Sequence, residues 1–168
     1  LCPDDGLMLR PAGPPDFAFI RALQARPELV PLIAADEEEA LHANLDAPDI
    51  AMFIWQEDGA PAGFVFLAGL TSKSRNREIR RIAVADPGQG TGTRCLRAIQ
   101  GYAFETLDTN RLWLDVAADN AQARHVSTSM GFREEGYFRR AWLRRTGDFA
   151  DLVIMAMLRE EWAARPPT

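Results

Sequence analysis

The sequence predicts a mixed α/β fold in which helices pack on a single sheet. Three observations support this prediction: strand-like and helix-like segments alternate along the chain, β-branched and aromatic residues gather in the strand-like runs, and no linker, repeat or low-complexity stretch divides the 168 residues. Taken in order, the segments read β-α-α-β-β-β-α-β-α-β-β. We therefore expect one domain over residues 1–168, an α+β (mixed α/β) architecture with about 6–7 strands and about 4 helices on both faces of the sheet.

The first part of the chain is predicted to hold one strand and two helices. A short apolar strand over 7–10 precedes a helix over 14–24, because its PPD start suits a first helical turn. Two further prolines end this helix, and a second one is expected over 36–45. Its acidic start, DEEE, complements the positive end of the helix dipole. The same run also suits a patch that binds a cationic substrate.

The middle of the chain is predicted to form an antiparallel meander followed by a helix. Strand-like runs cover 50–56, 62–70 and 77–84, and the turn-rich link EDGAP joins the first two. Apolar residues at helical spacing then predict a helix over 93–107. Cys95 falls on the apolar side of this helix, so we expect it to be buried.

The last part of the chain is predicted to add three strands and a helix. A strand over 111–117 precedes a helix over 120–130, which Gly131 ends. Two longer strands within 132–158 then turn around TGD at 146–148.

Composition excludes several classes of protein. No apolar run approaches the roughly 20 residues that cross a bilayer, and the first residues lack a basic-then-apolar signal pattern, so we expect neither a membrane partner nor export. Cys2 and Cys95 give no disulfide framework and no metal-ligand spacing, so a reducing, cytoplasmic setting without a metal is expected. The net charge of −5 argues against a nucleic-acid partner.

The stretch ADPGQGTGTRCL, residues 85–96, carries Gly88, Gly90 and Gly92 where a strand becomes a helix. Glycine allows unusual backbone conformations and a close approach of a ligand, and the N–H groups at a helix start favour phosphate. Neither familiar nucleotide loop fits: no Gly-Lys pair follows, and Thr93 stands where the dinucleotide fingerprint needs a third glycine. A glycine-rich turn without a ligand is the alternative.

Two motifs resemble the GNAT superfamily of acetyl-CoA-dependent N-acetyltransferases. The run IAVADPGQGTGTRCL is similar to the central motif, a hydrophobic strand ending in valine and then [RQ]-x-x-G-x-G/A at a helix start. Gly90 and Gly92 take the defining positions, whereas Pro87 stands where the family prefers Arg or Gln. The block WLDVAADNAQARHVSTSMGFREEG resembles the next motif, and its matching positions are Asn120, Ala123, Gly131 and Phe132. The tail is similar to the branch of ribosomal-protein N-terminal and small-amine acetyltransferases.

This resemblance implies a GNAT-like splayed, mostly antiparallel sheet in which the strands over 78–84 and 111–117 part to admit the pantetheine arm of acetyl-CoA. The implied cofactor-binding residues are Ile82, Ala83, Val84, Gly88, Gln89, Gly90, Thr91, Gly92, Thr93, Arg94, Asn120 and Ala123. An amide near Val84 would hold the thioester carbonyl oxygen. Asn120 also suits the N-cap of the helix that follows it, and it can do both.

Acetyl transfer to an amine needs a base to remove a proton from an ammonium whose pKa is near 10. Glu78 is the candidate, because it lies six residues before Val84, as the catalytic glutamate does in histone-acetylating members. Strand alternation predicts that Glu78 shares a face with Arg80, Ile82 and Val84. The alternative is a solvated glutamate paired with Arg80 or Arg77.

The acid that protonates the leaving thiolate is less clearly encoded. Ser127 stands where many members of the family place a tyrosine, so it is the candidate acid or the anchor of a water. Tyr137 is a substitute from the next strand, the alternative being packing at the sheet edge. His125 is the only histidine near the motif, and a single histidine on a helix usually points to solvent. The arginines 139, 140, 144 and 145 suit an acidic acceptor or RNA, or simply form a solvated face.

The resemblance thus implies direct transfer of an acetyl group from acetyl-CoA to a primary amine, either a protein N-terminus or a small amine, in a ternary complex. Cys95 is the cysteine within the motifs, and because it is expected to be buried, no nucleophile for a covalent intermediate is expected. A non-catalytic acyl-CoA-binding module, a different acyl donor and a homodimer stay open.

Overall fold

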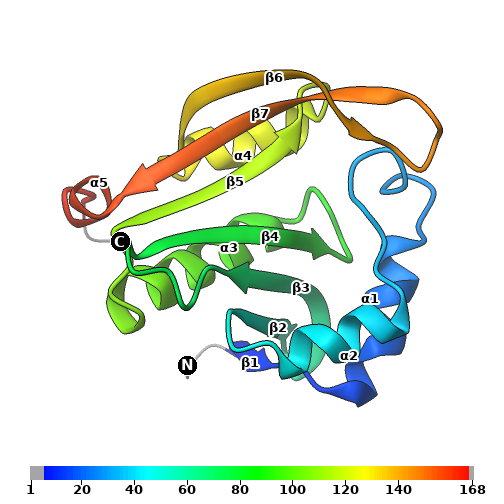
Figure 1. Ribbon diagram of the computed structural model, residues 1–168. Coiled ribbons are helices and arrows are strands. Elements are labelled where there is room, and N and C mark those ends of the chain that lie inside the picture. Colours follow the sequence, from blue (N-terminus) through cyan, green and yellow to red (C-terminus); the bar gives the residue numbers. More distant parts are fainter. Residues whose placement is uncertain (1–5, 167–168) are drawn as a thin grey trace.

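The computed structural model describes residues 6–166, within which seven strands form one sheet in the order β1-β2-β3-β4-β5-β7-β6 (Figure 1). The strands are β1 Leu7–Pro11, β2 Ile50–Glu57, β3 Ala60–Ala68, β4 Asn76–Val84, β5 Arg111–Ala117, β6 Arg133–Leu143 and β7 Phe149–Leu158. Neighbouring strands run antiparallel except β4 and β5, which are parallel. The predicted mostly antiparallel sheet is therefore confirmed.

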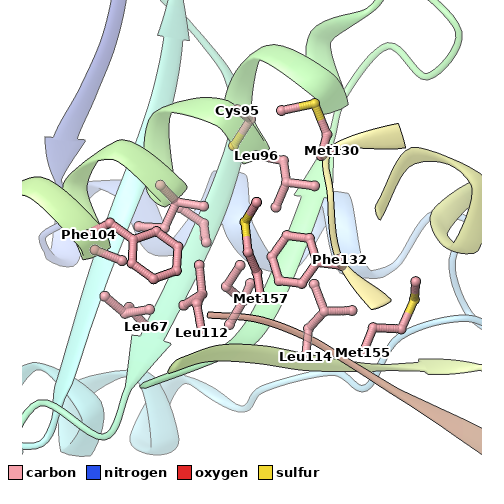
Figure 2. Packing of buried hydrophobic residues seen from close by; sticks show 14 of the residues in the cluster. Leu67, Cys95, Leu96, Phe104, Leu112, Leu114, Met130, Phe132, Met155 and Met157 are labelled. Carbon is pink, nitrogen blue, oxygen red and sulfur yellow. The ribbon is translucent and has the colours of Figure 1, made fainter. Parts of the chain in front are cut away.

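Helices cover both faces of this sheet. They are α1 Phe17–Gln24, α2 Glu38–Asp46, α3 Thr91–Gly101, α4 Ala121–Ser129 and α5 Arg159–Ala163, with a 3₁₀ turn at Pro14–Asp16 and a π-helical turn at Tyr102–Thr106. The helices α1 and α2 pack against one face, here called the α1 face, through side chains such as Ile20 and Leu41. The opposite face, the α3 face, holds the larger cluster (Figure 2), including Leu96, Leu112 and Met155. Within residues 6–166, no helix has the length and hydropathy needed to cross a bilayer.

Two helical segments differ from the sequence-based expectation. The helix expected over 93–107 begins at Thr91 and changes after Gly101 into one π-helical turn. Gly101 weakens the regular helix, and the turn buries Phe104, whose ring stacks on Trp162 with 5.5 Å between centroids. Helix α5 was not expected, because a five-residue helix directly after a strand has too little periodicity to detect.

A β-bulge in β4 changes which residues share a face with Glu78. The register with β3 shifts between Ile79 and Arg81, so Arg80 is an extra residue. Ile82 and Val84 consequently pack on the α3 face, together with Ile79. Glu78 instead lies on the α1 face with Arg81 and Ala83, so the expected face shared with Ile82 and Val84 is wrong. Its expected neighbour Arg80 does contact it, through two hydrogen bonds.

The parallel pairing of β4 and β5 is short. Only Asn76–Glu78 of β4 pair with Arg111–Trp113 of β5, and the two strands then part, as Figure 1 shows. The expected splay between the segments 78–84 and 111–117 is therefore confirmed. It leaves the second half of β4 with β3 as its only strand neighbour among the described residues.

Candidate active site

The open edge of β4 presents backbone groups where β5 has parted. The N–H of Ala85 donates to the carbonyl of Ala62 in β3 at 2.8 Å. Because backbone groups alternate in direction along an antiparallel strand, those of Ala83 also point to β3, whereas those of Ile82 and Val84 point to the open side. Of the three residues expected to bind through their backbone, Ile82 and Val84 thus face the gap, whereas Ala83 faces β3.

The glycine stretch forms a tight loop at the start of α3. Gly88 and Gly90 have φ values of +87° and +78°, a region that residues with a β-carbon rarely adopt. Gly90 is the N-cap of α3, so the N–H groups of Thr91, Gly92 and Thr93 in the first turn lack acceptors inside the helix. This loop fits an anion such as a pyrophosphate.

Gln89 and Arg94 contribute to the loop in different ways. Gln89 is exposed between the two glycines with positive φ. Arg94 uses its own N–H for the carbonyl of Gly90 at 3.0 Å, and its guanidinium donates to Glu57 at 2.8 and 3.0 Å. The geometry of Arg94 therefore does not favour direct binding of the cofactor, because its N–H donors are engaged within the protein.

Two carboxylates lie together where β4 and β5 part. Glu78 pairs with Trp113 across the parallel strands, and Asp115 lies two residues further on the same face. Glu78 accepts two hydrogen bonds from Arg80 on its Oε2, at 3.0 and 3.3 Å, while its Oε1 has no partner among the described residues. Glu78 is thus paired with Arg80, as expected for a solvated surface glutamate, and it also retains a free oxygen, as a base requires.

Asp115 was missed by sequence reasoning. Although the residue is exposed, protein around its carboxyl group removes water, and this desolvation together with the charge of Glu78 raises the pKa of Asp115. A raised carboxyl pKa beside a second carboxylate is typical of groups that hold or accept protons. The alternation in RLWLDVA, with Leu112 and Leu114 buried, is the signal that would have placed Asp115 on the opposite face beside Glu78.

The segment 25–37 between α1 and α2 is fastened to the rest of the site by arginines. Arg144 and Arg145, beside the β6–β7 turn, donate to the carbonyls of Pro31 and Ile33 at 3.1 and 2.8 Å, and Arg26 donates to the carbonyl of Ala85. In Figure 1 this segment reaches towards the β6–β7 turn. Two of the four arginines of the basic cluster therefore hold a neighbouring segment.

The acidic start of α2 is largely used within the protein. Asp36 accepts from Gln24 at 2.7 Å and from Arg81 at 3.3 Å. Arg21 pairs with the exposed Glu37 and Glu38, at 3.2 and 3.8 Å. None of these acidic side chains forms a hydrogen-bonded cap on α2, but the ion pairs and the position at the helix start favour the helix-dipole interpretation of the DEEE run over an acceptor patch.

Asn120 caps α4. Its Oδ1 accepts from the N–H of Ala123 at 3.1 Å, so the capping role is confirmed. The Nδ2 group has no acceptor among residues 6–166, which leaves a donor for a ligand at the end of β5.

The candidate acids lie in different surroundings. Ser127 is buried on α4, 5% exposed, and its hydroxyl makes no hydrogen bond to the described residues. Tyr137 is exposed on β6, with β7 and β5 between it and β4. Its hydroxyl donates to Asp151 at 2.6 Å, and this bond raises the pKa of Tyr137. His125 is exposed on α4.

The described cysteine offers no nucleophile. Cys95 is fully buried on α3, and desolvation raises the pKa of its thiol to about 12, so almost no thiolate exists at neutral pH. Cys2 lies outside the described residues. The described chain also lacks any group of three or more His, Cys, Asp and Glu side chains arranged to hold a metal ion.

Comparisons with known proteins identify the family. A model of the acetyltransferase (GNAT) family matches residues 17–132. The chain is 37% identical over 106 residues to the "Putative ribosomal N-acetyltransferase YdaF" of Bacillus subtilis, covering 62% of this chain and 57% of that protein. It is 26% identical over 117 residues to spermidine N(1)-acetyltransferase of Escherichia coli, covering 69% and 62%. The matches thus span less than two thirds of either relative's length.

Solved structures share the fold. Spermidine N-acetyltransferase from Vibrio cholerae in complex with CoA and spermine superposes with a TM-score of 0.83 at 21% identity, covering 95% of this chain and 99% of that one. A dodecameric structure of the Vibrio cholerae enzyme gives 0.81 at 22% identity, covering 98% and 100%. Because the family model covers more than half of the residues, including both the glycine loop and Asn120, the chain belongs to the GNAT acetyltransferase family.

Proposed function

We propose that this chain is an acetyl-CoA-dependent N-acetyltransferase that acetylates a primary amine by direct attack in a ternary complex. The observation that carries the proposal is the divergence of β4 from β5 after Glu78, which leaves the open edge of β4 leading to the glycine loop of α3. An extended arm can pair with this edge like an added strand. A pyrophosphate can bind the helix start at its end.

The donor would be held mainly by backbone. The groups of Ile82 and Val84 suit the amides of the pantetheine arm, and the N–H groups of Thr91, Gly92 and Thr93 suit the pyrophosphate. The free Nδ2 of Asn120, at the start of α4 beyond the end of β5, would approach from the other side. Acetyl-CoA supplies a thioester acetyl group and a thiolate leaving group. Pro87 removes a side chain at the loop entrance, but it takes away none of these amides.

Glu78 and Asp115 would prepare the acceptor. A protonated amine is attracted to two adjacent carboxylates, and the free Oε1 of Glu78 can take its proton directly or through a water. Asp115, whose pKa is raised by desolvation and by the charge of Glu78, accepts a proton more readily than an ordinary aspartate. We assign the base to this pair, with Glu78 as the acceptor of the proton.

Ser127 would assist the leaving group. Its hydroxyl is unpaired on α4 and can anchor a water that returns a proton to the thiolate. Tyr137 is disfavoured for this role, since Asp151 binds its hydroxyl and raises its pKa. Direct attack on the donor accords with the burial and raised pKa of Cys95.

The acceptor class follows from the relatives by name only. They are named for spermidine and, in one case, for ribosomal acetylation, so a small amine and a peptide N-terminus are both proposed acceptors. Because the acidic run at α2 is engaged with Arg21, Arg81 and Gln24, a substrate with several positive charges has no obvious advantage. We place the enzyme in the cytoplasm, where acetyl-CoA and reduced thiols are abundant.

A thiol-release assay tests the function directly. Acetyl-CoA is offered with spermidine, a simple monoamine, an amino acid and a peptide with a free N-terminus, while calorimetry measures donor binding. We expect binding and release of CoA with at least one amine. Tight binding without turnover for every amine would favour an acyl-CoA-binding module, and no binding would refute the proposal. Succinyl-CoA in the same assay tests the choice of donor.

We also propose that a second copy of the chain covers the outer edge of the sheet. Strand β6 has β7 as its only strand neighbour among the described residues, and its Tyr137 and Phe138 are 56% and 54% exposed. Its sequence REEGYFRR carries acidic residues before Tyr137 and basic residues after it, so an antiparallel second copy would bring opposite charges near one another, although β6 is irregular after Phe138. Light scattering should give a dimer mass, or a multiple of it, and Phe138→Asp should lower it. A monomeric unaltered chain would refute the pairing.

A further inference from the structure

Arg94 and Glu57 form a cross-link between the end of β2 and the glycine loop. Glu57 receives the Nε of Arg94 on Oε1 at 2.8 Å and the Nη2 on Oε2 at 3.0 Å. The indole N–H of Trp55 adds a bond to Oε1 at 3.0 Å. These bonds, led by that from Arg94, lower the pKa of Glu57, so the carboxylate is ionised at neutral pH. Such two-point contacts fix orientation as well as distance.

The same guanidinium continues into the loop. Its Nη1 donates to the carbonyl of Gln89 at 3.1 Å, and its Nη2 donates to the hydroxyl of Thr91 at 3.2 Å. A β-carbon on Gly90 would lie 2.9 Å from Nη1, so the loop folds closely around the arginine. One side chain therefore ties Gln89 and Thr91 to Glu57, which is 37 residues from Arg94 in the sequence.

We propose that Glu57 and Arg94 are a positioning pair that holds the loop in its anion-binding conformation, a proposal that rests on the proposed donor site. The bond from Arg94 holds the carbonyl oxygen of Gln89 against the arginine, and the N–H groups of the first turn of α3 are left for the ligand. Glu57 also neutralises Arg94, so the arginine braces the loop rather than serving as a phosphate ligand. Pro87, which lacks the side chain expected there, increases the dependence on this brace.

The pair makes a prediction that a direct phosphate contact does not make. If Arg94 bound phosphate, Glu57→Gln would free the arginine and leave donor binding equal or tighter. For a brace, Glu57→Gln and Arg94→Gln each weaken binding, by roughly 5- to 50-fold, and the double variant is little worse than either single one. Arg94→Lys keeps the charge but loses the two-point geometry, so it should resemble Arg94→Gln.

The experiment compares acetyl donors with and without a pyrophosphate. Affinity for acetyl-CoA and acetyl-dephospho-CoA, which both contain the pyrophosphate, should fall in the variants, whereas kcat/KM for S-acetylpantetheine should not change. Asp16→Asn is the matched control, since it breaks another two-point pair, with Arg10 at 2.7 and 2.9 Å, away from the loop. It should alter thermal stability at most.

Three results would overturn the proposal. Equal losses with S-acetylpantetheine would mean that the variants damage the fold rather than the loop. Unchanged acetyl-CoA affinity in Glu57→Gln and Arg94→Gln, with the unaltered chain binding normally, would refute the brace and leave the proposed function intact. No donor binding by the unaltered chain would refute both.

Discussion

Asn120 is expected to do two things, and two substitutions separate them. Its Oδ1 caps α4 through the N–H of Ala123 at 3.1 Å, whereas its Nδ2 is left for the donor. Asn120→Ala removes both groups. Asn120→Asp keeps an oxygen acceptor at the helix start, where a negative charge is also favourable, and removes only the amide donor.

The structure sets the size of each effect. Loss of an N-cap costs about 1 kcal/mol, which lowers the Tm of a chain of this size by about 2–4 °C. A hydrogen bond from Nδ2 to the donor contributes about 1 kcal/mol, or about fivefold in affinity. Asn120→Ala should therefore lose both stability and affinity, and Asn120→Asp should lose affinity only.

Differential scanning fluorimetry and calorimetry with acetyl-CoA measure the two effects side by side. Gln122→Ala, on the exposed first turn of α4, serves as a control that should change neither. An Asn120→Asp variant with full donor affinity would show that the side chain is only a cap. An Asn120→Ala variant with an unchanged Tm would contradict the stabilisation inferred from the hydrogen bond between Asn120 and Ala123.

Three further substitutions test the proton-handling groups. Glu78→Gln should lower kcat/KM by about 10²-fold or more and flatten its alkaline rise; an unchanged pH profile would remove Glu78 from the site. The pKa of Asp115 is raised in the folded state, so the folded protein favours the protonated carboxyl group. The contribution of this group to the free energy of unfolding is therefore fully present below its unfolded pKa, near 3.9, and is lost as pH rises through its pKa in the folded state. Asp115→Asn should accordingly raise Tm at pH 7 but not at pH 3, while turnover falls; a lower Tm at pH 7 would contradict the desolvated carboxylate. Ser127→Ala should reduce kcat by less than about 10²-fold, because a thiolate leaves readily, and should leave donor affinity unchanged; a loss of affinity instead of kcat would assign Ser127 to binding.

Local patterns were enough to predict the order of the strands and of the helices before α5, whereas the divergence of β4 from β5 was expected from the resemblance to the GNAT superfamily. The strand over 111–117 and the meander before it follow from runs of apolar and β-branched residues, which do not depend on distant contacts. The bulge at Arg80 could not be predicted in this way, since an extra residue in one strand shows only against the register of its partner. It reversed the face assigned to Ile82 and Val84 relative to Glu78.

The parts of the candidate site that are formed by backbone groups could be predicted from the sequence. The contacts between side chains of distant elements could not. Gly90 and Asn120 can be identified from their positions at the starts of predicted helices. The bonds of Arg94 to Glu57 join residues from separate elements, so the sequence alone offered Arg94 only as a member of the loop. Asp115 was overlooked for a similar reason, because its raised pKa arises from desolvation by the surrounding protein and from the charge of Glu78 on another strand.

The most direct test of the donor site is a titration of the isotope-labelled chain with acetyl-CoA, followed by the amide signals in nuclear magnetic resonance spectra. The account predicts shifts for Val84, Thr91 and Gly92, together with the side-chain amide of Asn120, and no shift for the outer strand β6. Shifts confined to β6 or to the segment 25–37, or none at saturating donor, would contradict it.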